Sequence, residues 1–248
     1  MRVAALYDIH GNLHALEAAL ADVEDARPDV VLVGGDVVLG PFPRETLELL
    51  DGLGERALFI RGNTDRILVQ PLAEPTGPSP WPERQAWVRA QLTDEQLARF
   101  SDLSDTTVID VDGLGDVLFC HGSPRSDEEI VTWATPPERL SEILSGVQQR
   151  LVVCGHTHVQ FDRVVGGVRV VNAGSIGMPY ENEPGAYWAL LGPDVELRRT
   201  AYDLERAASA IRATAFPDAD EFAKEHVLHP ASAEEATEHF ERMAAGGG

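Results

Sequence analysis

The sequence predicts an α/β protein in which buried strands alternate with amphipathic helices. Short runs that are almost entirely apolar, such as Ala57-Leu58-Phe59-Ile60, are typical of strands in a sheet that is covered on both faces. Segments with leucines three or four residues apart follow such runs, as between Asn12 and Asp25. The length of 248 residues fits one domain with additions and allows a large core.

The first strand ends in Asp8-Ile9-His10-Gly11-Asn12. Side chains two residues apart on an extended backbone point the same way, so Asp8 and His10 can bind one ligand together. A carboxylate and an imidazole are part of a ligand set for a metal ion, although such turns are commonly only polar loops. Asn12 is expected to cap the next helix. His14, in the first turn of that helix, is expected to be a surface or packing residue, with substrate contact as the alternative.

Two further strands end in a similar way. Asp29 to Val33 leads into Gly34-Gly35-Asp36, and the strand at residues 57–60 leads into Gly62-Asn63-Thr64-Asp65. A helix that begins near Pro43 is expected between them.

Residues 70–105 interrupt this alternation. Five prolines between Pro71 and Pro82 predict a stiff loop, and two short helices follow, the second with a capping box of Thr93 and Gln96. Large apolar side chains that need burial favour an arm packed on the core, and a lid over the site is the alternative. These side chains are Trp81, Trp87, Leu92, Leu97 and Phe100.

Residues 106–200 are expected to contain three hairpins. The first turns at Gly113-Leu114-Gly115 and its second strand ends in His121; the others turn at residues 166–167 and 192–194. Thr135 is expected to cap a helix that Pro136 begins, with Glu138 completing the capping box.

The strand from Leu151 to Cys154 ends in Gly155-His156-Thr157-His158. Cys120 and Cys154 each stand close to histidines of these strand ends. On buried strands cysteine is usually a small apolar residue, and a thiolate ligand is the alternative.

From Asp203 the chain is expected to form helices that break at Pro217 and Pro230. Residues 1–202 are therefore interpreted as the main domain and residues 203–248 as a helical extension packed on it. The histidines of this extension are expected at the surface, because no pattern of partners surrounds them. They are His226, His229 and His239.

The chemistry is inferred from the strand ends. In open α/β sheets ligands bind at the carboxyl ends of the strands, so polar residues at five such ends should converge on one crevice. The expected metal ligands are Asp8, His10, Asp36, Asn63, His121, His156 and His158. Seven exceed what one ion normally takes from side chains, which indicates two ions, with Asp36 placed to bridge them. Two divalent cations outweigh two aspartates, so the site should attract hydroxide and a small phosphate.

Composition limits the partners. The formal net charge is −21, and an acidic surface repels nucleic-acid backbones, so no nucleic-acid polymer is expected. No stretch resembles a signal peptide or a membrane span, and two cysteines suit a reducing compartment, so we expect a cytoplasmic protein without a membrane partner. The oligomeric state stays open and includes a homo-oligomer.

The spaced motifs resemble the five blocks of the calcineurin-like metallophosphoesterases across roughly residues 1–190. The stretch from Asp8 to Leu16 is similar to the small bacterial and archaeal phosphodiesterase branch. The matching motifs are Asp8-x-His10, Gly35-Asp36-x-x-x-Gly40, Gly62-Asn63-x-Asp65, His121-Gly122 and Gly155-His156-x-His158.

The resemblance implies a β-sandwich flanked by helices, a four-layer α/β/β/α fold. The oxygen and nitrogen ligand set, without an obvious thiolate, suits two divalent transition-metal ions chosen from Mn, Fe, Zn, Ni and Co. The resemblance implies that Asn63 also contacts the phosphate. The implied ligands of one ion are Asp8, His10, Asp36 and His158, and those of the other are Asp36, Asn63, His121 and His156.

Thr64 departs from the family pattern, which usually has histidine there. A threonine hydroxyl is no acid near neutral pH, which favours phosphodiesters over alkyl monoesters; Thr64 stays a candidate for substrate contact. Without that histidine, Asp65 is expected only to cap the next helix. The predicted function is hydrolysis of small phosphodiesters by metal-bound hydroxide, with Asp36 and Asn63 as catalytic residues. The alternatives are a phosphomonoesterase or nucleotide phosphatase of the same fold, and a non-catalytic binding scaffold.

Overall fold

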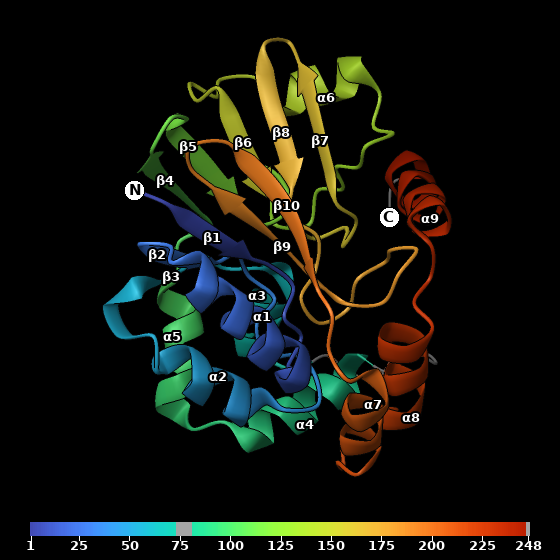
Figure 1. The fold of residues 1–248 in the computed structure, drawn as a ribbon. Helices are drawn as coiled ribbons and strands as arrows, with labels where there is room; N and C mark the ends of the chain where they lie inside the picture. Colours follow the sequence, from blue (N-terminus) through green and yellow to red (C-terminus); the bar gives the residue numbers. More distant parts are fainter. Residues whose placement is uncertain (73–80, 247–248) are drawn as a thin grey trace.

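The computed structural model describes residues 1–72 and 81–246. Two five-stranded sheets pack face to face, and helices cover their outer faces (Figure 1). The first sheet has the order β10-β9-β1-β2-β3. Its strands are β1 (Val3–Leu6), β2 (Val30–Val33), β3 (Ala57–Phe59), β9 (Ala186–Leu191) and β10 (Val195–Thr200).

The second sheet has the order β4-β5-β6-β8-β7. Each sheet contains three neighbouring parallel strands, β1, β2 and β3 in the first and β5, β6 and β8 in the second. The three predicted hairpins are present as β4–β5, β7–β8 and β9–β10. The strands of the second sheet are β4 (Thr106–Val111), β5 (Gly115–Cys120), β6 (Leu151–Cys154), β7 (Phe161–Val165) and β8 (Val168–Asn172).

The apolar core has three clusters, one at each interface between layers. Alternate residues of β1 divide between them: Ala4 and Leu6 pack toward the helices, and Val3 and Ala5 pack between the sheets. The third cluster lies between the second sheet and α6. This confirms the predicted four-layer α/β/β/α fold. The helices up to α6 are α1 (Leu13–Ala26), α2 (Pro43–Asp51), η1 (Gly54–Arg56), α3 (Asn63–Val69), α4 (Trp81–Gln91), α5 (Asp94–Asp102) and α6 (Pro137–Ile143).

Val88 of α4, Phe100 of α5 and Leu92 between the two helices pack in the first cluster. The prediction that Trp81 is buried is wrong, since 46% of this residue is exposed. The loop prediction for Pro75, Pro78 and Pro80 lies outside the described residues.

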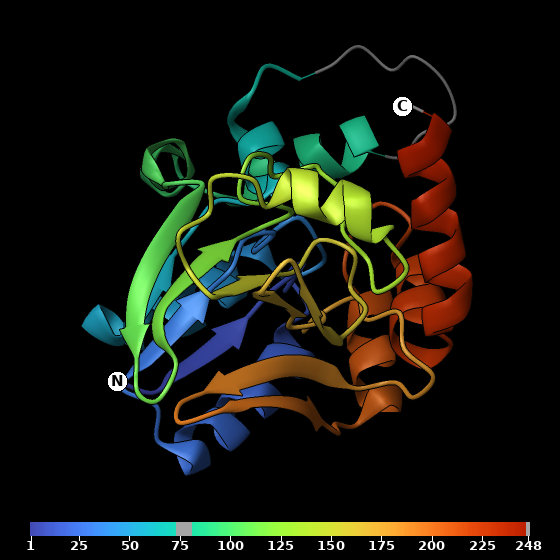
Figure 2. The same cartoon turned by 90° about the horizontal axis from the view of Figure 1, so that it is seen from above.

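The C-terminal extension lies along one edge of the sandwich (Figure 2). It consists of α7 (Leu204–Arg212), α8 (Ala219–Phe222), the π-helix η2 (Ala223–Leu228) and α9 (Ala233–Gly246). The expected cap at Thr135 is wrong: α6 has no side-chain cap, and the Thr135 hydroxyl instead donates to Glu241 of α9 at 2.7 Å. The Thr132 hydroxyl donates to the same carboxylate at 2.6 Å, so two threonines anchor α9 to the main domain.

Among the described residues, no helix combines the length and the apolar character that crossing a bilayer requires.

Candidate metal centre

All seven predicted ligands lie where the carboxyl ends of the two sheets meet. The parallel strands of each sheet point the same way, and the sandwich brings both sets of ends to one edge. Asp8 and His10 follow β1, Asp36 follows β2, Asn63 begins α3 after β3, His121 follows β5, and His156 and His158 follow β6.

The backbone at these strand ends is strained. Seven described residues other than glycine have a positive φ, a conformation that costs about 1–3 kcal/mol for most side chains. Five of the seven are predicted ligands, which indicates that the fold holds these side chains in place at a cost in stability. The five are Asp8, His10, Asp36, His156 and His158.

The motif glycines allow the ligand loops to approach one another closely. A Cβ atom on Gly62 would lie 2.2 Å from Oδ1 of Asp36, and one on Gly155 would lie 2.5 Å from Oδ2 of Asp8. A Cβ atom on Gly40 would lie 1.7 Å from the carbonyl oxygen of His10. Only glycine fits these contacts without moving a ligand.

One carboxylate oxygen of Asp8, Oδ1, lies among three imidazole rings. Its Oδ1 is buried and has no hydrogen-bond partner among the described residues. The Nε2 atoms of His158, His121 and His10 lie 3.1, 3.8 and 3.9 Å from it. Its Oδ2 accepts the backbone N–H of His156 at 2.9 Å.

Two of these imidazoles are oriented by backbone carbonyls. Nδ1 of His121 lies 2.9 Å from the carbonyl oxygen of Gly34, and Nδ1 of His158 lies 2.7 Å from that of Met178. Donation from Nδ1–H leaves Nε2 with a lone pair directed at the carboxylates. In that neutral form the lone pairs face carboxylate oxygens and repel them unless a proton or a metal cation lies between them, so the residues fit a bound metal ion.

Asp36 contacts histidines of both implied ligand sets. Its Oδ1 lies 3.5 Å from Nε2 of His121, and its Oδ2 lies 3.7 Å from Nε2 of His10. Candidate ligand atoms within 4.8 Å of one another form two triads, Asp8-His10-His158 and Asp8-Asp36-His121. Both carboxylates therefore lie between the two groups of histidines.

Asn63 and His156 lie next to these triads, although His156 belongs to neither of them. Oδ1 of Asn63 lies 3.0 Å from Nε2 of His121, so the amide oxygen and the imidazole face the same space. Nε2 of His156 lies 3.2 Å from the carbonyl oxygen of Glu128, and its ring packs against that of His121 with centroids 5.2 Å apart.

Burial and charge give the histidines different protonation states. Burial lowers the pKa of both His10 and His156 to about 4, so these two are neutral ligands near pH 7. Burial also opposes the charge on His121, but the carboxylates of Asp36 and Asp8 raise its pKa to about 10. A cation at Nε2 of His121 must displace this proton, so metal binding there releases a proton.

Asp65 does more than cap α3. Its carboxylate accepts the backbone N–H groups of Asp36 at 2.8 Å, Val37 at 3.0 Å and Gly62 at 2.9 Å. It therefore fixes the loop that carries Asp36. Burial and the charge of Asp36 raise the pKa of Asp65 to about 7.

The two cysteines do not belong to the cluster of expected metal ligands. Both are buried and pack in the apolar cluster beneath α6. Burial raises the pKa of Cys154 to about 12, and that of Cys120 well above its usual range. These contacts agree with the interpretation of both as small apolar residues.

A cavity of about 750 Å³ opens onto the cluster. One wall, which we call the metal wall, consists of His10, Asp36, Asn63, His156 and His158.

Thr64 also lines the cavity, and its N–H donates to Oδ1 of Asp36 at 2.9 Å. His14 does not line it; its ring packs edge-on against Phe42, and Nδ1 lies 3.5 Å from Glu17.

The opposite wall, which we call the C-terminal wall, comes from residues 224–243. The prediction that all three histidines of the extension lie at the surface is wrong for His226, whose Nδ1 is buried. His229 and His239 are exposed, but they also line the cavity. Sequence reasoning missed this wall because nothing in the local pattern marks which face of a terminal helix meets the strand ends.

Sequence reasoning also missed the loop of residues 173–178, which contacts the backbone of Asp8. The Ser175 hydroxyl donates to the carbonyl oxygen of Asp8 at 2.8 Å, and the N–H of Gly177 donates to the same oxygen at 3.0 Å. The available signal was a serine between Gly174 and Gly177 directly after a parallel strand.

Comparisons with known proteins agree with this geometry. A curated relative, an uncharacterized protein of Methanocaldococcus jannaschii, is 23% identical over 236 residues, which cover 87% of this chain and 94% of the relative. The crystal structure of a hypothetical protein from Pyrococcus horikoshii has a TM-score of 0.78 at 24% identity and covers 93% of this chain and 99% of its own. The crystal structure of a metallophosphoesterase from Sphaerobacter thermophilus has a TM-score of 0.74 at 26% identity, with the same coverage of 93% and 99%. The model of the calcineurin-like phosphoesterase superfamily domain matches residues 1–192. The chain therefore belongs to the calcineurin-like phosphoesterase superfamily.

Proposed function

We propose that this protein hydrolyses small phosphodiesters at a centre of two divalent transition-metal ions. The observation that carries the proposal is Oδ1 of Asp8, a buried carboxylate oxygen without a hydrogen bond among the described residues and with three imidazole Nε2 atoms within 3.9 Å. An unpaired buried carboxylate costs several kcal/mol, and cations offset that cost.

The residues divide into two ligand groups. His10 and His158 stand on one side of the carboxylates, and His121, Asn63 and His156 stand on the other. When bound there, two divalent ions would activate a water molecule and stabilise charge that develops on the phosphoryl oxygens. The side-chain amide of Asn63 lines the cavity, which supports its role in holding the phosphate.

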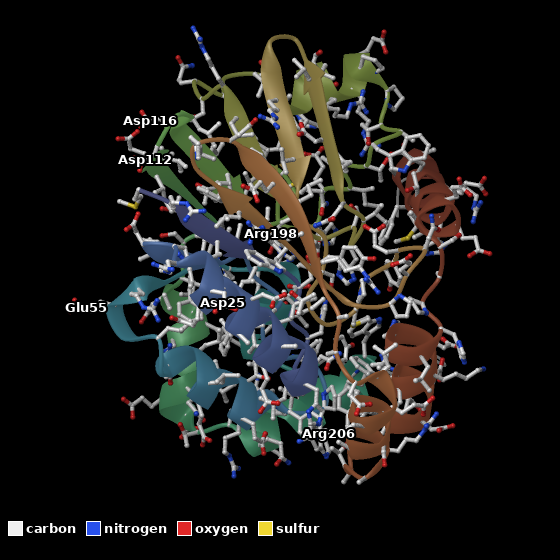
Figure 3. All side chains as sticks on the ribbon, in the orientation of Figure 1. Asp25, Glu55, Asp112, Asp116, Arg198 and Arg206 are labelled. Carbon is white, nitrogen blue, oxygen red and sulfur yellow. The ribbon has the colours of Figure 1, made fainter. Side chains whose placement is uncertain are left out.

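Two features support a small diester as the substrate. A cavity of about 750 Å³ accommodates a molecule of drug size rather than a polymer. The formal net charge of −21, to which exposed side chains such as Glu55, Asp112 and Asp116 at the periphery contribute (Figure 3), disfavours the approach of a long polyanion.

Thr64 supports a diester with a good leaving group. Its hydroxyl is buried without a hydrogen-bond partner among the described residues, and it supplies no acid near neutral pH. General-acid assistance is typically worth about 10²–10⁴-fold, so the missing assistance should slow esters with poor leaving groups the most.

The test is activity of protein reconstituted separately with Mn, Fe, Co, Ni and Zn. We expect faster hydrolysis of bis-p-nitrophenyl phosphate than of alkyl monoesters, in proportion to metal content. Faster turnover of alkyl monoesters would instead indicate a phosphomonoesterase. No turnover by fully loaded protein would indicate a binding scaffold.

A further inference from the structure

The C-terminal wall lies outside residues 1–192, to which the family model matches. It faces the metal wall across the same cavity, so a substrate held at the metal wall has its remaining atoms beside η2 and α9. The anchoring of Glu241 by Thr132 and Thr135 keeps α9 in this position.

Aromatic rings connect the two walls. Tyr180 stacks on the ring of His158, with centroids 5.1 Å apart and an interplanar angle of 16°. The rings of Phe240 and His226 lie 6.1 and 6.2 Å from that of Tyr180, tilted by 51° and 60°. Tilted and edge-on arrangements of this kind leave a face or an edge for a further ring.

The rim of the cavity is also apolar. Trp81 and Met243 line it, and they are among the few large apolar residues that the described chain leaves half exposed, at 46% and 50%. Both side chains therefore add apolar surface that an organic group in the cavity would cover.

The π-helix η2 turns three consecutive residues, Lys224, Glu225 and His226, toward the cavity. Such segments are rare and occur frequently at functional sites. Nδ1 of His226 is buried without a hydrogen-bond partner among the described residues, and burial lowers its pKa to about 3. Because Nδ1 is shielded in this structure, a hydrogen bond from it to a ligand requires the uncharged His226 ring to turn toward the cavity that it lines.

We propose that the C-terminal wall, with Tyr180, is the subsite for an uncharged, ring-bearing organic group of the phosphoester, and that His226 bonds a polar atom on that ring. This inference rests on the proposed function for the position of the phosphoryl group. A planar ring fits because the subsite combines aromatic faces with the flexible thioethers of Met178 and Met243.

The test compares phenylphosphonate with methylphosphonate, whose head groups are the same, by calorimetry on the metal-loaded full chain. We expect phenylphosphonate to bind about tenfold tighter or more, because only it fills the subsite. In Phe240→Ala the ratio should fall to about threefold or less, while the affinity for methylphosphonate stays the same. Phe240→Leu, which keeps apolar volume without a ring, should give an intermediate ratio.

The matched control is Glu238→Ala, an exposed position on α9 that does not line the cavity, and it should leave the ratio unchanged. His226→Leu should remove any extra affinity for 4-hydroxyphenylphosphonate over phenylphosphonate, and His226→Gln should restore part of it. Equal affinities for the phenyl and methyl compounds would overturn the subsite.

The two proposals fail separately. A protein that hydrolyses phosphodiesters but binds both phosphonates equally has the proposed function without this subsite. A protein that prefers phenylphosphonate but hydrolyses no ester has the subsite without the proposed function.

Discussion

The two walls of the cavity are built in opposite ways. The metal wall consists of short loops at strand ends, with ligands at positive φ and glycines packed against their backbones. The C-terminal wall consists of helices whose side chains reach the cavity and which two threonines anchor through one glutamate. Backbone strain and close glycine contacts are thus concentrated at the expected metal ligands, whereas the proposed subsite depends on helix side chains that can be substituted without moving those loops.

The largest expected effect comes from the carboxylates of the metal wall. Asp36 directs different oxygens at His10 and His121, whereas the imidazoles near Asp8 all face one oxygen, Oδ1. Asp36→Asn should therefore weaken the binding of both ions. It should lower kcat/KM by about 10³-fold or more, as expected for several kcal/mol of lost charge stabilisation. Asp8→Asn should lose less activity and retain more metal. Equal metal content and activity in the two variants would contradict a bridging role for Asp36.

The next prediction tests whether the close contact between the Gly62 backbone and Asp36 keeps the metal wall in place. In Gly62→Ala the new Cβ would lie 2.2 Å from Oδ1 of Asp36 and must displace it. A displacement near 1 Å can cost about 10²-fold in rate, and we expect a loss of that order. Gly246→Ala on α9, where a Cβ meets nothing within 4 Å, is the control. Wild-type kcat/KM in Gly62→Ala would show that the loops are not held by this contact.

The loop of Asp36 should also depend on Asp65. In Asp65→Asn, an amide NH₂ would face a backbone N–H that the carboxylate now accepts, so we expect a loss of about 1–3 kcal/mol in the free energy of unfolding. Chemical denaturation measures this change in the free energy of unfolding. Asp105→Asn, which removes only an exposed ion pair with Arg61, should cost less than about 1 kcal/mol. A change in Asp65→Asn as small as in this control would refute the role of Asp65.

The smallest effect should come from the anchor of the C-terminal wall. Glu241→Ala removes the acceptor of the Thr132 and Thr135 hydroxyls, which should cost about 1–2 kcal/mol and loosen α9. Phenylphosphonate binding should weaken several-fold while metal content stays constant, because none of the seven expected metal ligands lies on α9. Loss of metal from this variant would contradict the separation of the two walls.

The same contrast explains what the sequence could predict. Each ligand of the metal wall follows a recognisable apolar strand, so local patterns such as Asp8-x-His10 and His156-x-His158 identified the cluster and the fold. The hydrogen bonds of Asp65, the carbonyl of Met178 and the position of His226 depend on contacts between segments far apart in the chain. The sequence predicted the helices of the C-terminal extension, but not which residues of the main domain their inner face contacts.

The central claim is that two ions bind between these carboxylates and imidazoles. Crystals of protein reconstituted with manganese, measured at the manganese absorption edge, test it most directly. We expect two anomalous peaks about 3.5–4 Å apart, one on each side of Asp36, in the cavity that faces α9. One peak or none after reconstitution, or peaks away from Asp8 and Asp36, would contradict it.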